Sequence, residues 1–231
     1  MDDPPPPDPA TRNVLEPDCS RCPSLVESRT RITWGNGPPD ADAVVVGEAP
    51  GAGDPDADVW GGGNHTGLAY TSRHSGRAIR RLLTRLGVDA YYTNAVKCFP
   101  ADADDPTTNR EPTAEELATC RAHLDAELRS VAPRAVVATG KHATRSVLAL
   151  DAAGAEGDRD ADPLRDGFLD AVLDPIPLRS VDATLVPLLH PSYQAVWLSR
   201  LGYESGEYRH EVAARLADCG VDVDVARPNG N

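Results

Sequence analysis

The stretch ADAVVVGEAPG, residues 41–51, predicts a strand that runs into a glycine-rich turn. Its apolar run is short and bounded by turn-forming residues, as expected for a buried strand. Three later stretches predict further strands, at residues 90–98, 134–140 and 184–192. Helical patterns lie at residues 74–88, 111–133, 141–150 and 205–220. This alternation predicts an α/β fold, with a single three-layer α/β/α domain around a central, mostly parallel four-stranded sheet.

One folded domain is expected over residues 16–220 of the 231-residue chain. The first 15 residues are acidic and rich in proline, which predicts a disordered tail, and residues 221–231 predict a flexible C-terminal tail. Two acidic stretches, near residues 101–112 and 151–167, predict loop inserts within the domain. We expect a monomer.

The chain has a formal net charge of −13, which ordinarily argues against nucleic-acid binding. Its basic residues are arginine except for Lys97 and Lys141, and Asp outnumbers Glu. This composition is typical of proteins adapted to high salt, where the Debye length is only about 3 Å at 1 M and net charge says little about partners. The alternative is an ordinary acidic enzyme of a mesophile. No apolar run approaches the roughly 18 residues of a membrane span. The N-terminus lacks the basic start of a signal peptide, so we expect a cytoplasmic protein.

The residues that follow the four strands are the first candidates for a site, because the carboxyl ends of parallel strands meet at one edge of a sheet. They are the turn GEAPG with Glu48, then Asn94, then TGKH at 139–142, then His190 and Ser192 in HPS. We expect them to converge on one cleft.

Nucleotide-binding turns do not match this sequence. A phosphate-binding loop requires a lysine after its last glycine, but Gly53 is followed by Asp54. The dinucleotide pattern G-x-G-x-x-G is absent from the first turn, where Pro50 lacks an N–H and Glu48 would repel a phosphate. The H-x-E and P-C-x-x-C motifs of nucleobase deaminases are missing as well.

Five cysteines are present, and two of them form the metal-chelating spacing Cys19-x-x-Cys22. Two of the later cysteines, Cys98 and Cys120, could complete a site of four thiolates. Both zinc and an iron–sulfur cluster accept four thiolates, so spacing alone leaves both open. Cys219 is expected to be a small core residue.

Five ordered segments resemble the iron–sulfur-containing uracil-DNA glycosylases of the uracil-DNA glycosylase superfamily. They are CSRCPSLVESRT, PDADAVVVGEAPG, YYTNAVKCFP, NREPTAEELATC and LLHPS. The resemblance implies an enzyme of base excision repair that hydrolyses the N-glycosidic bond of uracil in DNA and leaves an abasic site. The Glu in GEAPG resembles family 4, whereas GGNHTGLAYTSRHSG and HPSYQ resemble family 5, so the subfamily stays open.

The resemblance gives the candidate residues roles. His190 would donate a hydrogen bond to uracil O2, Asn94 would read O4 and N3–H, and Glu48 would orient water or stabilise the cationic sugar, with Asp54 a weaker candidate. Tyr70 would stack on the base, and Ala49, Gly51 and Ser192 would line its pocket. A [4Fe–4S] cluster, favoured over zinc, would be held by Cys19, Cys22, Cys98 and Cys120.

Contacts with DNA are expected next to the base pocket. Arg73 and Arg77 could touch phosphates, while Arg80 and Arg81 could be solvated charges. Tyr193, Gln194 or Trp197 could fill the gap left by the flipped base, or this segment could be a helix packed into the core.

Two alternatives to a uracil-specific enzyme follow from the same residues. One is a family 5-like glycosylase that also removes hypoxanthine or other deaminated bases. The other is an iron–sulfur DNA-binding protein without turnover. The sequence names no repair or replication-clamp partner.

Overall fold

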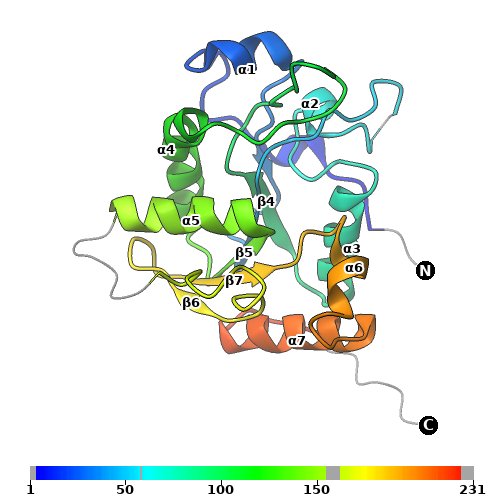
Figure 1. The fold of residues 1–231 in the computed structure, drawn as a ribbon, viewed down its shortest axis with the longest axis vertical. Coiled ribbons are helices and arrows are strands. Elements are labelled where there is room, and N and C mark those ends of the chain that lie inside the picture. Colours follow the sequence, from blue (N-terminus) through cyan, green and yellow to red (C-terminus); the bar gives the residue numbers. More distant parts are fainter. Residues whose placement is uncertain (1–3, 58, 155–161, 225–231) are drawn as a thin grey trace.

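A mixed sheet of seven strands forms the centre of the computed structural model, in the order β1-β2-β4-β3-β5-β7-β6 (Figure 1). The structure describes residues 4–57, 59–154 and 162–224. Its four central strands are parallel: β3 (Ala43–Gly47), β4 (Ala90–Asn94), β5 (Ala135–Thr139) and β7 (Thr184–Leu188). Each lies within a range predicted from sequence, and the α/β class is confirmed.

The expected four-stranded sheet is too small, because three short antiparallel strands extend its edges. They are β1 (Arg12–Asn13), β2 (Gly35–Asn36) and β6 (Ile176–Pro177). A two-residue strand has no hydrophobic periodicity, so no sequence pattern could have indicated these. β1 also lies within the stretch expected to be a disordered tail, where Arg12 donates hydrogen bonds to the carbonyls of Ile32 and Gly67.

Four long helices occupy the predicted helical stretches. They are α3 (Ser75–Arg85), α4 (Ala114–Val131), α5 (Lys141–Gly154) and α7 (Ser205–Asp218). Shorter helical segments are η1 (Pro9–Thr11), α1 (Pro23–Ser28), α2 (Gly63–Thr66) and α6 (Gln194–Leu198). None of the helices described is long and apolar enough to cross a membrane.

Side-chain hydrogen bonds fix the start of α4 and the last turns of α5. α4 starts at a capping box, in which the Thr113 hydroxyl accepts from the Glu116 N–H and the Glu116 carboxylate accepts from the Thr113 N–H. α5 runs four residues into the stretch expected to be a loop insert, and its buried Asp151 accepts from the backbone N–H groups of Arg179 and Ser180. The middle of that insert, residues 155–161, lies outside the described residues.

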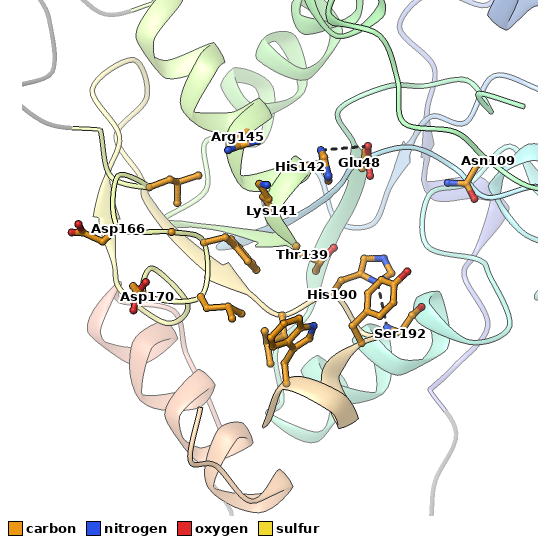
Figure 2. A pocket seen from close by; sticks show the side chains of 18 residues that line it. Glu48, Asn109, Thr139, Lys141, His142, Arg145, Asp166, Asp170, His190 and Ser192 are labelled. Atoms are coloured by element: carbon orange, nitrogen blue, oxygen red, sulfur yellow. Dashed lines mark hydrogen bonds and ion pairs between the residues drawn. The ribbon is translucent and has the colours of Figure 1, made fainter. Parts of the chain in front are cut away.

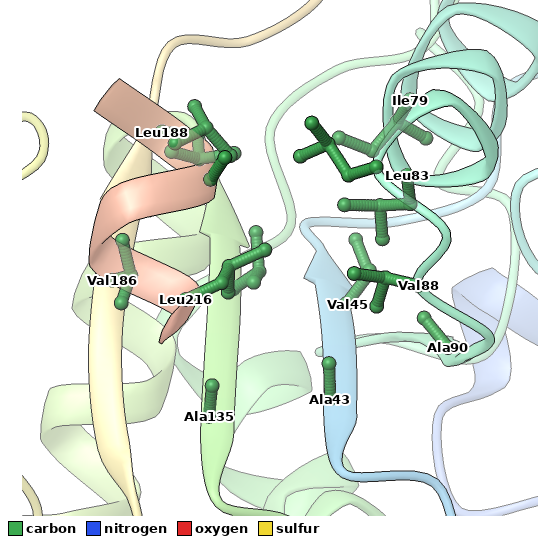
Figure 3. Packing of buried hydrophobic residues seen from close by; sticks show 14 of the residues in the cluster. Ala43, Val45, Ile79, Leu83, Val88, Ala90, Ala135, Val186, Leu188 and Leu216 are labelled. Carbon is green, nitrogen blue, oxygen red and sulfur yellow. The ribbon is translucent and has the colours of Figure 1, made fainter. Parts of the chain in front are cut away.

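Helices cover both faces of the sheet. On one face, α3 and α7 contribute Ile79, Leu83 and Leu216 to a core with alternate residues of the parallel strands (Figure 3). On the other face, α4 and α5 pack residues such as Leu124 and Val147 against the strand residues that point the other way. Because both faces are covered, the strand ends are where a site can open.

The described part of the expected C-terminal tail packs on the domain. Val221 is buried in the first core, and the Asp224 N–H donates to the carbonyl of Leu86. Residues 225–231 lie outside the described residues.

Candidate active site at the strand ends

A cavity of about 820 Å³ opens beside the turn after β3 and at the carboxyl ends of β5 and β7 (Figure 2). Residues that follow three of the four parallel strands line it: Glu48, Thr139, Gly140, Lys141, His142, His190 and Ser192. The structure therefore brings together most of the turns that the sequence indicated. Asn94, at the end of β4, is not among the lining residues.

His190 lies in the cavity wall with a defined pattern of hydrogen bonding. The backbone N–H of Ser192 donates to Nδ1 of His190 at 3.3 Å, so a neutral ring carries its proton on Nε2. Burial lowers the pKa of His190, which favours this neutral form. Gly140 adopts the left-handed region at φ +91°. It allows the turn after β5 to lie close to His190, since a Cβ on Gly140 would lie 3.2 Å from the His190 Cβ. The arrangement favours a neutral imidazole whose Nε2–H has no hydrogen-bond partner among the described residues.

Glu48 is half-buried and faces the helix that starts after β5. Its Oε1 lies 3.9 Å from Nδ1 of His142, and the other ring nitrogen of His142 lies 3.0 Å from Oε1 of Glu111 (Figure 2 shows the first contact). Burial raises the pKa of Glu48, the nearby His142 lowers it, and Glu111 raises it.

Asn94 and Tyr70 lie together behind the cavity wall. Asn94 pairs with Gly47 in the parallel register of β3 and β4, and a Cβ on Gly47 would clash with Asn94 Oδ1 and with the Tyr70 hydroxyl. The Tyr70 hydroxyl lies 2.6 Å from that of Thr139, which does line the cavity. Among the residues described, none hydrogen-bonds the side-chain amide of Asn94, although this residue is only 4% exposed. Its donor and acceptor are therefore available to a ligand.

A buried ion pair holds the backbone of Asn94. Nζ of Lys97 donates to the Asn94 carbonyl and to the Thr93 hydroxyl, both at 2.6 Å, and to Oε2 of Glu127. Glu127 is fully buried in α4 and also accepts from the Tyr91 hydroxyl. Sequence reasoning missed this pair, although a lysine inside an apolar stretch is rarely buried without a partner.

Arg80 holds the backbone of Tyr70 and is not the solvated charge that the sequence suggested. Its guanidinium donates to the Tyr70 carbonyl at 2.9 Å and to Asn36 Oδ1, and it lies 3.8 Å from the ring centre of Tyr92. Tyr70 adopts φ +56°, which is unfavourable for a non-glycine residue. The Arg80 contacts stabilise this conformation.

Only some of the other predicted base-pocket and DNA-contact residues line the cavity. Ser192 and Tyr193 line it, and Tyr193 is 62% exposed. Ala49 packs against the small core that contains Cys98 and Cys120, whereas Gly51 and Gln194 are not among the lining residues.

The predicted phosphate contacts lie on α3 or just before it. Arg73 is exposed before the helix begins, and the Arg77 guanidinium lies 5.4 Å from the ring centre of Trp60. Neither arginine lines the cavity.

Two loops supply cavity residues that sequence reasoning did not single out. Asn109 comes from the acidic insert at residues 101–112, and Phe168 follows the second insert. Arg145, one turn into α5, also lines the cavity. Loop residues carry no periodicity that could have indicated this placement, but Arg145 lies four residues after Lys141 and so shares its helix face. Trp197 of α6 lines this end of the cavity and, like Leu201, packs against the core, as the helix alternative expected, whereas Val196 is 58% exposed.

The four expected ligand cysteines share one small core on the other side of the turn after β3. Cys19, Cys22, Cys98 and Cys120 pack with apolar residues that include Leu25 and Trp34. Arg29 Nη1 lies 3.2 Å from Sγ of Cys98, and the Lys97 N–H donates to Sγ of Cys120. Burial raises the pKa of Cys22, Cys98 and Cys120, as does the proximity of the other cysteines. Cys219, as expected, packs against the core that lies between the sheet and helices α3 and α7.

A second group near these cysteines could also hold a metal ion. The ligand atoms of Glu16, Cys19 and His123 all lie within 4.8 Å of one another. The four cysteines do not form such a group within the described chain. A single tetrahedral zinc with bonds of about 2.3 Å would require sulfur atoms roughly 4 Å apart.

Comparison with known proteins identifies the family. The model of the "Uracil DNA glycosylase superfamily" matches residues 34–217. The chain is 34% identical over 164 residues to a type-5 uracil-DNA glycosylase of Pyrobaculum aerophilum, covering 58% of this chain and 66% of that protein. It is 32% identical over 136 residues to a type-4 enzyme of the same organism, covering 58% of this chain and 61% of that protein. For a type-4 enzyme of Thermotoga maritima the identity is 34% over 125 residues, with shares of 53% and 56%.

These matches span less than two thirds of the length of the curated relatives. The family model, by contrast, covers most of the present chain, from Trp34 in front of β2 to Ala217 near the end of α7. The chain belongs to the uracil-DNA glycosylase superfamily.

Proposed function

We propose that this protein is a monofunctional DNA glycosylase that hydrolyses the N-glycosidic bond of uracil in DNA, releasing uracil and leaving an abasic site. The observation that carries the proposal is the pairing of Glu48 and His190 across one cavity, with the unpartnered amide of Asn94 behind its wall. The names of the type-4 and type-5 relatives support it.

His190 stabilises the departing base. As the glycosidic bond breaks, negative charge develops on the uracil ring, and a preorganised donor at O2 lowers the barrier. The Nε2–H of a neutral His190 is such a donor, and the Ser192 N–H holds the ring in the tautomer that presents it. A neutral donor also leaves the base as an anion and does not transfer a full proton.

Asn94 selects uracil, and Tyr70 supports the base from one side. An amide can donate to O4 and accept from N3–H, whereas cytosine presents a donor where uracil has O4. The base enters by flipping out of the strand, and Gly47, which has no side chain, leaves room for Asn94 and Tyr70 to lie against its backbone. The N–H groups of Ala49 and Gly51 contribute at the turn.

Glu48 acts on the sugar side of the bond. Loss of the base builds positive charge on the sugar, which a carboxylate stabilises, and the same carboxylate can orient the attacking water. This role requires the ionised form. Burial opposes that form by raising the pKa of Glu48, and His142 favours it. Asp54 is exposed and outside the cavity lining, which favours Glu48 as the carboxylate.

A [4Fe–4S] cluster held by Cys19, Cys22, Cys98 and Cys120 fits the cysteine core. Burial raises the pKa of Cys22, Cys98 and Cys120, which opposes their thiolate forms unless a metal group neutralises them, and the Arg29 and Lys97 donors suit sulfur ligands. The wider sulfur spacing supports a cluster over a single zinc. When bound, the cluster links the N-terminal segment to the residues after β4.

DNA contacts are proposed around the cavity mouth. Tyr193 is an exposed aromatic beside His190, with ring centres 5.8 Å apart, and is the best candidate to fill the gap left by the flipped base, with Gln194 next to it. Arg73 and Arg77 are proposed to contact the phosphate backbone.

The experiment that tests the proposed function is an assay of product. An oligonucleotide with a single uracil is incubated with the purified protein at 0.1 M and about 3 M KCl, since the acidic composition predicts a requirement for salt. Free uracil and an alkali-labile abasic site are expected without added divalent metal. Tight binding of the oligonucleotide with no base release at either salt concentration would contradict an enzymatic function.

A broader base range is the second candidate, favoured by the match to a type-5 enzyme. Matched oligonucleotides with hypoxanthine or xanthine at the same position separate the two. Excision of uracil alone supports the uracil-specific enzyme, and excision of all three bases supports the broader one.

A further inference from the structure

His142 and Glu111 form a chain of contacts with Glu48 that the proposed roles do not use. Glu48 belongs to the turn after β3, His142 to the first turn of α5, and Glu111 to the acidic insert before α4. The imidazole lies between the two carboxylates, with Nδ1 3.9 Å from Glu48 and Nε2 3.0 Å from Glu111. Three segments distant in sequence therefore meet at the proposed catalytic carboxylate.

We propose that His142 is a positioning residue that holds the Glu48 carboxylate in place and in its ionised form, and that Glu111 anchors His142. This proposal rests on the proposed function of Glu48. Nδ1 lies 3.9 Å from Glu48, beyond hydrogen-bond range, and Nε2 lies 3.0 Å from Glu111, so we give His142 a charge–charge role between two carboxylates. A protonated ring in this place favours the ionised form of the half-buried Glu48, in keeping with the lowering of the Glu48 pKa by His142.

The other charged groups around the cavity do not replace this contact. Those lining the same cavity are Lys141, Arg145, Asp166, Asp170 and His190. Within the described chain, His142 is the basic residue whose ring nitrogen approaches the Glu48 carboxylate within 4.0 Å. His190 is favoured in its neutral form because burial lowers its pKa, so it adds no compensating charge.

The insert at residues 101–112 consequently takes part in the site. Its Arg110 donates to both carboxylate oxygens of the buried Glu116, at 2.7 and 2.8 Å, which fixes the end of the insert on α4. Glu111 follows Arg110 in the sequence. Its side chain is 73% exposed and contacts His142. A loop that seemed a surface extension thereby delivers a carboxylate to His142.

The test follows the Glu48 carboxyl directly. The protein is labelled with glutamate carrying ¹³C at the side-chain carboxyl, and the Glu48 signal, assigned by its loss in Glu48→Gln, is titrated by NMR. His142→Gln is expected to move the titration midpoint to higher pH, because the positive neighbour is gone. His142→Lys restores a cation and is expected to move the midpoint back toward that of the wild type. Glu115→Gln, an exposed acid at the start of α4, is the matched control and is expected to leave it unchanged.

A double-mutant cycle tests the anchoring by Glu111. Glu111→Gln removes a like charge and also frees His142, so its effect on the Glu48 midpoint is expected to differ between the wild-type and His142→Gln backgrounds. Equal effects in both backgrounds would show that Glu111 does not act through His142.

Excision rates connect this coupling to catalysis. In single-turnover assays, the acid limb of the pH–rate profile is expected to move to higher pH in His142→Gln, with recovery toward wild-type rates at alkaline pH. A rate reduced equally at every pH, or an unmoved NMR midpoint, overturns the proposal. If the wild type excises no uracil, the proposed function fails, and the NMR titration still decides whether His142 controls Glu48.

Discussion

Asn94 rests its side chain against the backbone of Gly47, its partner on the neighbouring strand, so closely that a Cβ on Gly47 would come within 2.5 Å of Asn94 Oδ1. The same Cβ would meet the Tyr70 hydroxyl at 2.9 Å. The missing side chain of Gly47 therefore makes room for both residues proposed to hold the base.

Gly47→Ala tests this relationship. The backbone of Gly47 is part of a regular strand, so the added methyl acts by displacing Asn94 and Tyr70. We expect uracil excision to fall by about 100-fold, the effect typical of misplacing a binding group by about 1 Å. Single-turnover kinetics measure the fall in excision, and a thermal melt measures any loss of stability. Gly206→Ala is the control, because a Cβ there meets nothing within 4 Å and the residue lies on α7 outside the cavity lining. Equal rates in both variants would contradict the placement of Asn94.

The protonation of His190 predicts a pH dependence of stability. Burial lowers the folded-state pKa below the ordinary value of 6.5, so between the two values the unfolded chain binds more protons. The contribution of His190 to the free energy of unfolding is therefore fully present above pH 6.5 and is lost as the pH falls through the folded pKa. Urea unfolding at pH 5 and pH 7.5 should show a larger acid-induced loss in the wild type than in His190→Gln. The same loss in both proteins would argue against a buried neutral His190.

Arg80 is expected to matter for stability through its planar guanidinium. Arg80→Lys keeps the charge but cannot bond Asn36 and the Tyr70 carbonyl together while it stacks on Tyr92. We expect a loss of about 2 kcal/mol in the free energy of unfolding, measured by urea titration. Arg85→Lys, at the exposed end of the same helix, is the matched control and should change stability by less than about 0.5 kcal/mol.

The cysteine core predicts a coloured protein. With a [4Fe–4S] cluster the purified protein should absorb near about 400 nm, and iron and sulfide analysis should give about four of each per chain. Cys98→Ser should remove the absorbance, whereas Cys219→Ser should keep it, since Cys219 packs against another core and not with the four cysteines. One zinc per chain without visible absorbance would replace the cluster with a zinc site.

The central sheet could be predicted because its strands are apolar runs, such as residues 43–46, bounded by turn formers. The edge strands could not, because Arg12–Asn13 and Ile176–Pro177 are too short to carry a pattern. Strand ends likewise indicated the cavity residues Glu48 and His190, since parallel topology brings those ends together. Glu111 reaches the site through a tertiary contact from an irregular loop, and no local pattern specifies such a contact.

Buried charge was the other limit on prediction. Arg80 has the spacing of a surface helix residue, and Lys97 lies near apolar residues in the sequence. Only the fold shows that Arg80 donates to Asn36 and that Lys97 donates to Glu127. Their partners are 44 and 30 residues away in the sequence. Such pairs depend on the relative position of elements, which propensity and periodicity do not encode.

The most direct measurement of the central claim is the single-turnover rate of uracil release from a defined oligonucleotide by the wild type, His190→Ala and Asn94→Ala. His210→Ala, an exposed histidine on α7 away from the cavity, is the control. We predict release of free uracil by the wild type and the control, and rates lower by at least about 100-fold in the two site variants. Wild-type rates in His190→Ala and Asn94→Ala would contradict the claim that this cavity is where the base is cleaved.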